Sequence, residues 1–305
     1  MNGELAGFSV PDPSGTMRGL DADLCRAVAA AIFGDIGKVR FLPQMTVEAG
    51  LDALAAARID LLARNATVTM SRDAGRPVTP TAIYFYDGLG FLVQQALNVT
   101  SPRQLGERTI CWAGAEGPGT AADNLTALAG RQNLTVTIRR FDTSAQAVAA
   151  MEAGECQAFA ADAGALATRR VTDFREPGHW IVLAEIISRE PLAPYVRAND
   201  QHWRDLVFWT QQLLFGAEYF GVTSTNLVSR LGDPDLRVRQ FLGVEPGFGR
   251  HLRLSDNWGA QVISLVGNYG EIFERNLGRA SIVGMERGLN AQWTQGGLIY
   301  SLPTR

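Results

Sequence analysis

The fold first shows in the stretch Leu20-Asp21-Ala22-Asp23-Leu24-Cys25-Arg26-Ala27-Val28-Ala29-Ala30-Ala31-Ile32-Phe33. Its apolar residues recur at helical spacing, and both aspartates stand near its start, where the helix dipole favours negative charge. A short strand pattern follows at 39–42, then a second helix pattern at 47–57 and an apolar strand at 59–62. We interpret this alternation of helix and strand as one α/β unit.

The same alternation starts again near residue 96 and predicts a second α/β unit. We expect strands at 109–112, 134–139 and 157–161, and helices at 120–128 and 144–153. Two extended apolar stretches, 84–94 and 180–196, are candidates for strands that link the lobes. The predicted organisation is a discontinuous lobe 1, residues 1–93 plus 194–305 with a helical C-terminal extension, interrupted by lobe 2, residues 94–193.

Composition limits the class of protein. The chain has 305 residues, of which 46% are apolar, enough for a large core in two compact units. Lys+Arg 28 against Asp+Glu 31 leaves a formal net charge of −3 with no long block of either sign, so we expect no nucleic-acid or anionic-membrane surface. No apolar stretch reaches the roughly 18–20 residues of a membrane span, and residues 1–5 lack the charged and apolar regions of a secretory signal.

Signatures of catalysis and metal binding are missing from the sequence. It contains no G-x-S-x-G, H-E-x-x-H or G-x-x-x-x-G-K-[ST] motif, and its three histidines lie far apart. Cys25, Cys111 and Cys156 lack the close pairs of a zinc site or a C-x-x-C redox motif, so we expect no metal and no cofactor. Three cysteines are compatible with three buried thiols or with one disulfide and one leftover thiol.

One glycine-rich loop follows a predicted strand and opens a predicted helix. Its sequence, Gly117-Pro118-Gly119-Thr120-Ala121-Ala122, matches the G-x-G-x-x-A pattern of dinucleotide-binding loops. The proline and the lack of an acid at the end of the next strand argue against a dinucleotide. A plainer use is anion binding, because the free N–H groups of a helix N-terminus stabilise a carboxylate as well as a phosphate. Thr120 is the candidate ligand residue here.

Segment 60–73 passes abruptly from an apolar strand into hydroxyls, an amide and two arginines. In α/β folds, ligands bind where strands end. Arg72 offers a planar fork suited to bidentate contact with a carboxylate, and Thr67 and Asn65 can add neutral hydrogen bonds. Arg64 is a further candidate ligand residue of this segment.

Helix capping is the plainer interpretation of these polar residues. Thr69 or Ser71 could cap a helix in an exposed loop. In the second lobe an apolar strand ends on Asp162, which could receive a ligand ammonium or cap a helix at 163–170, and the two roles are compatible. A zwitterion would satisfy Arg72 and Asp162 together.

Five fragments carry a resemblance to a known family. They are GLDADLCRA at 19–27, SRD at 71–73, YFYDGLGF at 84–91, VGNYGEIFERN at 266–276 and RGLNAQW at 287–293. In this order they resemble the periplasmic solute-binding proteins for polar amino acids, solute-binding protein family 3, in the branch that serves general L-amino-acid importers. The resemblance extends over nearly the whole chain.

The resemblance implies a type II periplasmic-binding-protein-like fold: two α/β lobes with a ligand cleft between them. It implies that Arg72, in the family's T-x-x-R turn, clamps the ligand α-carboxylate with help from Asn65 and Thr67. It also implies that Asp162 contacts the α-ammonium and that Thr120 meets the carboxylate from lobe 2.

Two departures from the family pattern concern the side-chain pocket. Ala121 and Ala122 replace hydroxyl residues of the helix start, and Val68 stands where relatives often have tryptophan. The carboxylate clamp should persist, whereas the resemblance carries no substrate preference to this chain.

By resemblance, the chain is a periplasmic, monomeric binding protein that delivers free L-amino acids to the permease subunits of an ABC transporter and is not an enzyme. The alternative is an enzyme on the same fold, such as a periplasmic dehydratase acting on a small carboxylic acid, because fold does not determine function. The ligand domain of a sensor is a third possibility, and it would need a tether.

The family pattern also bears on the cysteines. The resemblance implies that relatives begin with a signal peptide and a strand whose cysteine pairs with the equivalent of Cys25, and we expect that first strand to be missing here. Cys111 and Cys156 remain as the other pair, so we expect them to form a disulfide. Loss of a strand exposes a sheet edge in lobe 1 and predicts lower stability than in a full-length relative.

Overall fold

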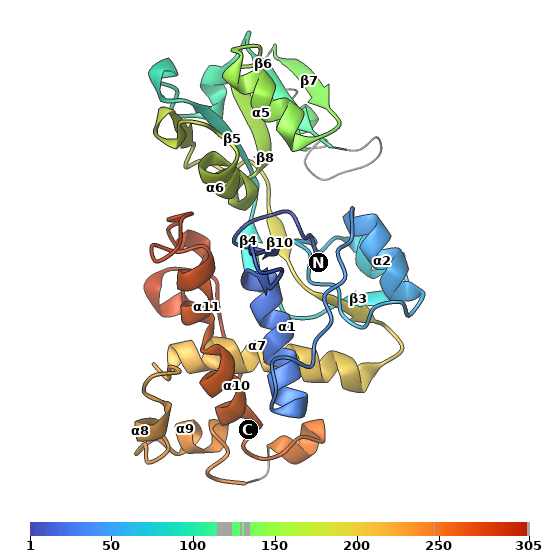
Figure 1. Cartoon of the computed structure of the whole chain (residues 1–305), viewed down its shortest axis with the longest axis vertical. Coiled ribbons are helices and arrows are strands. Elements are labelled where there is room, and N and C mark those ends of the chain that lie inside the picture. The colour runs from blue at the N-terminus through green and yellow to red at the C-terminus, as the bar shows by residue number, and fades with distance from the viewer. Residues whose placement is uncertain (115–123, 129, 131–134, 247, 304–305) are drawn as a thin grey trace. The chain divides into compact units, whose positions relative to one another are not determined.

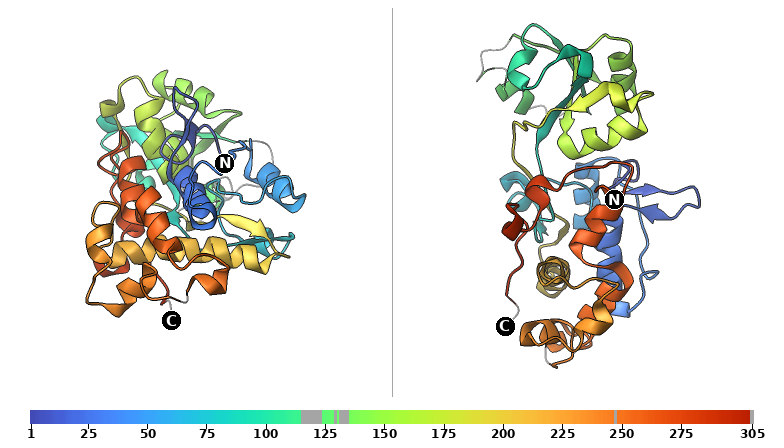
Figure 2. Two further views of the ribbon diagram at one scale, coloured as in Figure 1. Left: turned by 60° about the horizontal axis from the view of Figure 1, so that its bottom comes forward. Right: turned by 90° about the vertical axis from the view of Figure 1, so that its left-hand side faces the viewer.

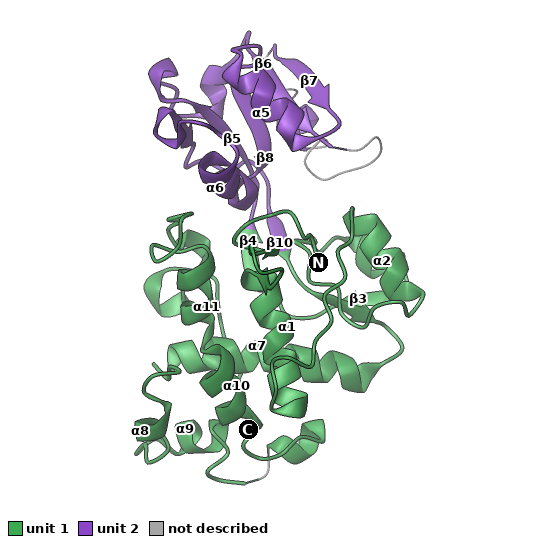
Figure 3. Ribbon diagram, viewed as in Figure 1, with its two compact units in different colours: residues 1–86, 192–305 green, residues 87–191 purple. Residues whose placement is uncertain are grey.

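The computed structural model describes residues 1–114, 124–128, 130, 135–246 and 248–303. The chain divides into unit 1, Met1–Tyr86 with Leu192–Arg305, and unit 2, Asp87–Pro191 (Figure 3). It crosses between the units at 86/87 and at 191/192, whereas the sequence predicted crossings at 93/94 and 193/194. Strands β4 (Phe85–Asp87) and β10 (Glu190–Leu192) carry the two crossings and pair with each other.

Unit 2 is built on a five-stranded sheet in the order β7-β6-β8-β5-β9 (Figure 1). Its strands are β5 (Leu89–Gln94), β6 (Thr109–Ala113), β7 (Thr137–Phe141), β8 (Ala158–Asp162) and β9 (Trp180–Val182). β6 is parallel to β7 and β8, whereas β5 is antiparallel to β8 and β9. Among its helices are α5 (Ser144–Glu152), α6 (Ala163–Thr172), η1 (Gln95–Leu97), η2 (Pro102–Leu105) and η3 (Pro177–His179). The α/β alternation expected from the sequence is confirmed.

Both faces of this sheet are covered by apolar side chains. Successive residues of a strand point to opposite faces. Leu89, Phe91 and Val93 therefore share one buried cluster, while Leu92 belongs to the other, which also contains Phe159. A sheet buried on both sides gives unit 2 a core of its own.

The cysteines follow the pairing implied by the resemblance. A disulfide joins Cys111 on β6 to Cys156, two residues before β8, with Cα atoms 5.7 Å apart. The neighbouring, parallel course of β6 and β8 brings the two residues together. Cys25 is a buried free thiol, and burial raises its pKa to about 12.

Unit 1 is mainly helical. α1 (Leu20–Phe33), which has the predicted bounds, packs against α7 (Gln201–Tyr219), α10 (Trp258–Val266) and α11 (Tyr269–Asn276) (Figures 1 and 2). The other helices are α2 (Val47–Ala55), α3 (Met70–Asp73), α8 (Leu227–Arg230), α9 (Leu236–Phe241), η4 (Gly249–Leu252), η5 (Gly288–Asn290) and η6 (Trp293–Gln295). Short strand pairs complete the unit: β1 (Val10–Pro11) with β2 (Met17–Arg18), and β3 (Val78–Pro80) with β11 (Tyr195–Arg197).

The start of α1 requires glycine. Gly19 has a φ of +124°, and a Cβ at this position would lie 2.1 Å from the carbonyl oxygen of Phe8. A side chain would therefore both strain the backbone and collide with its neighbour.

The two strands predicted for lobe 1 are wrong. Residues 39–42 form no strand, and within 59–62 only Leu62 makes a bridge, to Tyr195. Val39, Phe41 and Leu61 do pack against a buried cluster that includes Cys25. They line a groove of about 510 Å³ beside α1. The apolar pattern correctly identified buried side chains, but a strand also needs a neighbouring strand for its backbone hydrogen bonds.

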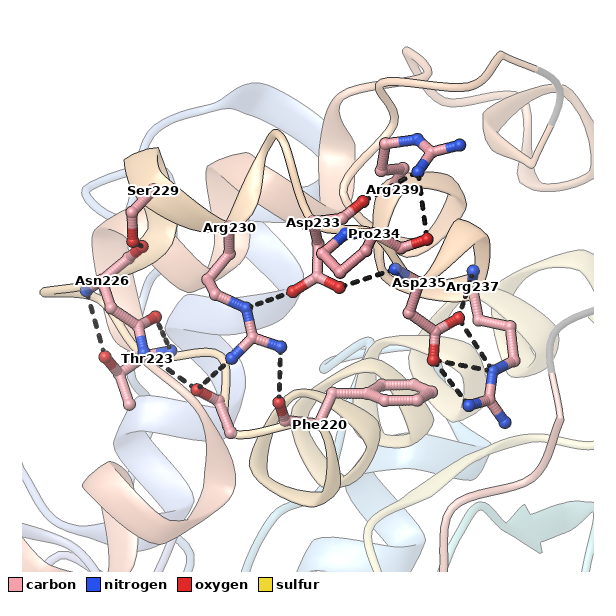
Figure 4. Close-up of polar contacts among 11 residues, drawn as sticks. Phe220, Thr223, Asn226, Ser229, Arg230, Asp233, Pro234, Asp235, Arg237 and Arg239 are labelled. Carbon is pink, nitrogen blue, oxygen red and sulfur yellow. Dashed lines mark hydrogen bonds and ion pairs between the residues drawn. The ribbon is translucent and has the colours of Figure 1, made fainter.

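Arginines hold together the segment between α7 and α9 (Figure 4). Arg230 donates from Nη2 to the carbonyl oxygen of Phe220 at 2.9 Å, and its Nε lies 2.6 Å from a carboxylate oxygen of Asp233. The Nη2 of Arg237 lies 2.5 Å from a carboxylate oxygen of Asp235. Polar contacts thus hold this segment, in which few side chains are buried.

Candidate functional site

The loop that carries most of the candidate side chains lies beside the chain that leads into β11. The backbone groups of Leu62 and Tyr195 exchange two hydrogen bonds, of 3.0 and 2.9 Å, and the N–H of Ala193 donates to the carbonyl oxygen of Ala66 at 3.1 Å. These antiparallel contacts fix the course of the loop between residues 62 and 67.

A single helical turn, α3, ends this loop and positions Arg72. The hydroxyl of Thr69, its N-cap, accepts the backbone N–H of Arg72 at 3.3 Å. The cap that sequence reasoning offered as the plainer interpretation is therefore present. The cap uses only the backbone N–H of Arg72, so the guanidinium can contact other groups.

Arg72 is held from two sides. Its Nη1 donates to the carbonyl oxygen of Thr67 at 3.0 Å, and its Nε donates to Oε1 of Glu48 at 3.3 Å. Its Nη2 lies 3.3 Å from the same Glu48 oxygen, and the side chain is only 14% exposed. A guanidinium with this orientation is prepared to receive an anion in a fixed geometry.

Thr67 contributes its backbone to this arrangement. Its carbonyl oxygen also accepts the hydroxyl of Tyr195 at 3.0 Å, so two donors fix one peptide group. Burial raises the pKa of Tyr195 to about 12, although the charge of Arg72 opposes the rise. Tyr195 therefore stays neutral and remains a donor at physiological pH.

Arg64 points to a different part of the unit. Its Nε and Nη2 donate to the carbonyl oxygens of Gln44 and Met45, both at 2.6 Å. Burial lowers the pKa of Arg64, and the charge of Arg72 lowers it further. The structure thus uses Arg64 to hold the segment before α2.

Asn65 is close to a buried polar pair, Tyr84 and Asp21. It has a left-handed backbone with a φ of +48°, and its Oδ1 is buried without a hydrogen-bond partner among the described residues. The hydroxyl of Tyr84 donates to Asp21, whose other oxygen also has no such partner. Burial raises the pKa of Asp21 to about 6, and the hydrogen bond from Tyr84 partly opposes this. Burial also raises the pKa of Tyr84.

Asp21→Asn should flatten the pH dependence of stability. The pKa of Asp21 in the folded protein, about 6, is above the ordinary 3.8, so its stabilising contribution is complete below pH 4 and is lost as pH rises through 6. The shift corresponds to about 3 kcal/mol between pH 4 and 7.5. We expect Tm, followed by circular dichroism, to fall less over this interval in Asp21→Asn than in the wild type.

Asp142→Asn is the matched control for this experiment. Asp142 has a side chain that is 83% exposed, so its loss should leave the pH profile unchanged. Equal slopes of Tm against pH for Asp21→Asn and the wild type would contradict the role of Asp21.

In unit 2, Asp162 ends β8 and stands at the N-cap of α6, but its side chain makes no capping hydrogen bond. The cap comes instead from Asp87, whose Oδ1 accepts the N–H of Gly164 at 3.1 Å and that of Gly88 at 2.9 Å. Burial raises the pKa of Asp87 to about 6, and the nearby Glu190 adds to the rise. The helix-cap interpretation of Asp162 is therefore wrong, because the side chain of Asp87 caps α6 instead.

Glu190 belongs to the same polar cluster of unit 2. Its carboxylate is buried and accepts the amide of Asn124 at 2.8 Å and the hydroxyl of Ser188 at 3.1 Å. Asp162 pairs in register with Leu89, one residue beyond Gly88. Two buried acids, Asp87 and Glu190, thus lie near the strand end that carries Asp162, which makes this edge of unit 2 suited to a cation.

Several predicted residues lie outside this description. Thr120, Ala121 and Ala122 are not among the described residues. Arg72, Thr67, Asn65 and Arg64 share one loop of unit 1, whereas Asp162 belongs to unit 2. Sequence reasoning missed Glu48 and Asp87, and the one available signal was that Asp87 lies in the YFYDGLGF fragment.

The described residues offer neither a metal site nor a membrane-spanning helix. Among the described residues, no group of three or more His, Cys, Asp or Glu side chains is placed to hold a metal ion. In the same part of the chain, every helix is too short or too polar to cross a membrane.

Comparisons with known proteins agree on one family. Residues 1–101 match the bacterial extracellular solute-binding proteins, family 3. The general L-amino acid-binding periplasmic protein AapJ of Rhizobium johnstonii is 40% identical, with 100% of this chain and 89% of that protein covered. The glutamate/glutamine/aspartate/asparagine-binding protein BztA of Rhodobacter capsulatus is 39% identical, with the same coverage.

A solved structure agrees equally well. An ABC transporter/periplasmic binding protein from Brucella ovis with glutathione bound has a TM-score of 0.93 and 37% identity, covering 100% of this chain and 94% of that chain. A cysteine-binding protein from Campylobacter jejuni, 22% identical with a TM-score of 0.58, shares the fold. The two-lobe periplasmic-binding-protein fold expected from the sequence is confirmed.

Proposed function

The chain belongs to family 3 of the bacterial extracellular solute-binding proteins, and from this premise we propose that it binds free L-amino acids and delivers them to an ABC-type permease. Its relatives are named for amino-acid binding, which favours this function over the dehydratase considered from the sequence. We propose further that it works in the periplasm, as a monomer, and performs no chemistry on its ligand.

One observation carries the proposal: the guanidinium of Arg72, held in place by the carbonyl oxygen of Thr67 at 3.0 Å. A fixed, largely buried guanidinium is the group that best recognises an α-carboxylate, because its donors match both oxygens. Every free amino acid carries this carboxylate. Recognition of the common part of the ligand suits a protein whose relatives include a general amino-acid binder.

The ammonium end of the ligand is assigned to unit 2. We assign it to Asp162, since this carboxylate ends β8 at the edge of the unit 2 sheet. The buried acids Asp87 and Glu190 of the same unit add negative potential. Thr120 completes the proposed set as a second contact for the carboxylate.

Ligand binding then acts on the two crossings between the units. A ligand that touches Arg72 of unit 1 and Asp162 of unit 2 favours the conformation in which both contacts are made.

Calorimetric titration tests the proposal directly. Ligand-stripped protein is titrated with the twenty L-amino acids and with glutathione, which also carries a free α-ammonium and α-carboxylate. We expect saturable heat for at least one L-amino acid and none for its N-acetyl or α-amide derivative, since each derivative lacks one of the two charges. No heat from any member of the panel, with protein shown to be folded by circular dichroism, would refute the proposed function.

A further inference from the structure

Glu48 occupies one of the two edges of Arg72 that can bind a carboxylate. A guanidinium presents two donors on its side edge, Nε and Nη2, and two on its end edge, Nη1 and Nη2. A single oxygen of Glu48, Oε1, lies 3.3 Å from both Nε and Nη2. The side edge therefore already faces a carboxylate that belongs to the protein.

This contact is loose compared with the other contact that Glu48 makes. Good charge-assisted hydrogen bonds measure about 2.7–2.9 Å, and both contacts with Arg72 are longer. Oε2 of Glu48 lies 2.5 Å from Nη2 of Arg76, and Nη1 of Arg76 lies 2.5 Å from Asp52. Glu48 thus has a close partner that can retain it when Arg72 binds something else.

The exposure of the two side chains supports an exchange. The side chain of Glu48 is 46% exposed, whereas that of Arg72 is 14% exposed. Arg72 is also fixed by the carbonyl oxygen of Thr67, so it keeps its place without Glu48. Glu48 is free to shift toward solvent and Arg76 while the guanidinium stays.

We propose that Glu48 is an internal competitor for Arg72 that sets how tightly the ligand carboxylate is bound. This inference rests on the proposed function, because it concerns the same guanidinium. Glu48 lowers the affinity in two ways: its oxygen must leave the side edge of Arg72, and its charge repels the incoming carboxylate. A protein that must hand over its ligand gains a faster release from such a competitor.

A purely structural role for Glu48 predicts something different. Glu48 lies in the first turn of α2, where an acid is favoured by the helix dipole. If that were its only role, removing its charge would lower stability slightly and leave binding unchanged. If it served to orient Arg72, its removal would weaken binding.

The test compares Glu48→Gln with Asp52→Asn, titrated calorimetrically with L-glutamine and L-glutamate. Both changes remove one negative charge from the same helix, but Asp52 pairs with Arg76, whereas Glu48 pairs with Arg72 as well. We expect Glu48→Gln to lower Kd about three- to fivefold, the range of a half-exposed ion pair, and Asp52→Asn to change it less than about twofold. The off-rate measured by stopped flow should fall by a similar factor.

The outcomes separate the inference from the function on which it rests. Tighter binding cannot result from misfolding, so a gain confined to Glu48→Gln supports the competitor. An unchanged or weaker Kd in Glu48→Gln and in Glu48→Ala, both with wild-type Tm, overturns it while amino-acid binding itself stands. An equal gain in Asp52→Asn overturns it too, because the effect would then be one of net charge. A wild type that binds no amino acid refutes both proposals.

Discussion

Arg72→Ala should weaken amino-acid binding by about 2–4 kcal/mol, or roughly 30- to 1000-fold in Kd. The change removes the donors that we propose for the ligand carboxylate and also one donor to the carbonyl oxygen of Thr67. The loss should appear mainly as a faster off-rate, because the carboxylate loses the contact proposed for it.

Arg72→Lys sharpens this result. Lysine keeps the positive charge but lacks the planar fork, so we expect its affinity for the amino acid to lie between those of the wild type and the alanine variant. If charge alone mattered, lysine would bind as well as arginine.

Arg279→Ala is the matched control. Arg279 belongs to unit 1, has a side chain that is 77% exposed and pairs with Glu286 at 2.7 Å. We expect its loss to leave Kd unchanged, since exposed ion pairs contribute little. Retention of wild-type affinity by Arg72→Ala would place the carboxylate elsewhere.

Removing the disulfide should have the largest effect on stability. Cys111 and Cys156 enclose a loop with a sequence separation of 45 and are both buried in the core of unit 2. The double variant Cys111→Ala/Cys156→Ala should lose about 2–4 kcal/mol of unfolding free energy, because the unfolded chain regains the freedom that the bond removes. Urea unfolding with and without dithiothreitol measures this loss.

Cys25→Ala is the comparison for the disulfide. Because Cys25 forms no disulfide, this variant should remain sensitive to dithiothreitol, whereas the double variant should not. Denatured wild type should show one titratable thiol without reductant and three after reduction, since the chain has 3 cysteines. Three titratable thiols without reductant, or equal stability with and without dithiothreitol, would exclude the bond.

Part of the candidate site could be predicted because its signals are local. The strand-to-polar transition at 60–73 points to Arg72 without knowledge of any distant residue, and the T-x-x-R turn does form, with Thr69 as its cap. Glu48 could not be predicted in the same way. It lies 24 residues from Arg72, and only the packing of α2 beside the loop brings its carboxylate to the guanidinium.

Asp162 and Asp87 show the same limit. An acid directly before a helix is the usual cap, so the sequence favoured Asp162 for α6. The structure uses Asp87, 77 residues from Gly164, because β5 follows it and lies antiparallel to β8. A helix can therefore be capped by a residue that is distant in the sequence, and no local pattern reveals such a cap.

By itself, the sequence determined the bounds of α1, the α/β alternation of unit 2 and the loop that carries Arg72, because each depends on spacing within a few residues. Only the tertiary structure decided that 39–42 forms no strand, that Arg64 holds the segment before α2, and which acids face Arg72 and α6. The physical reason is that a charged or hydrogen-bonding group selects its partner by position in space, and chain neighbours within one helical turn or one strand do not contain that information.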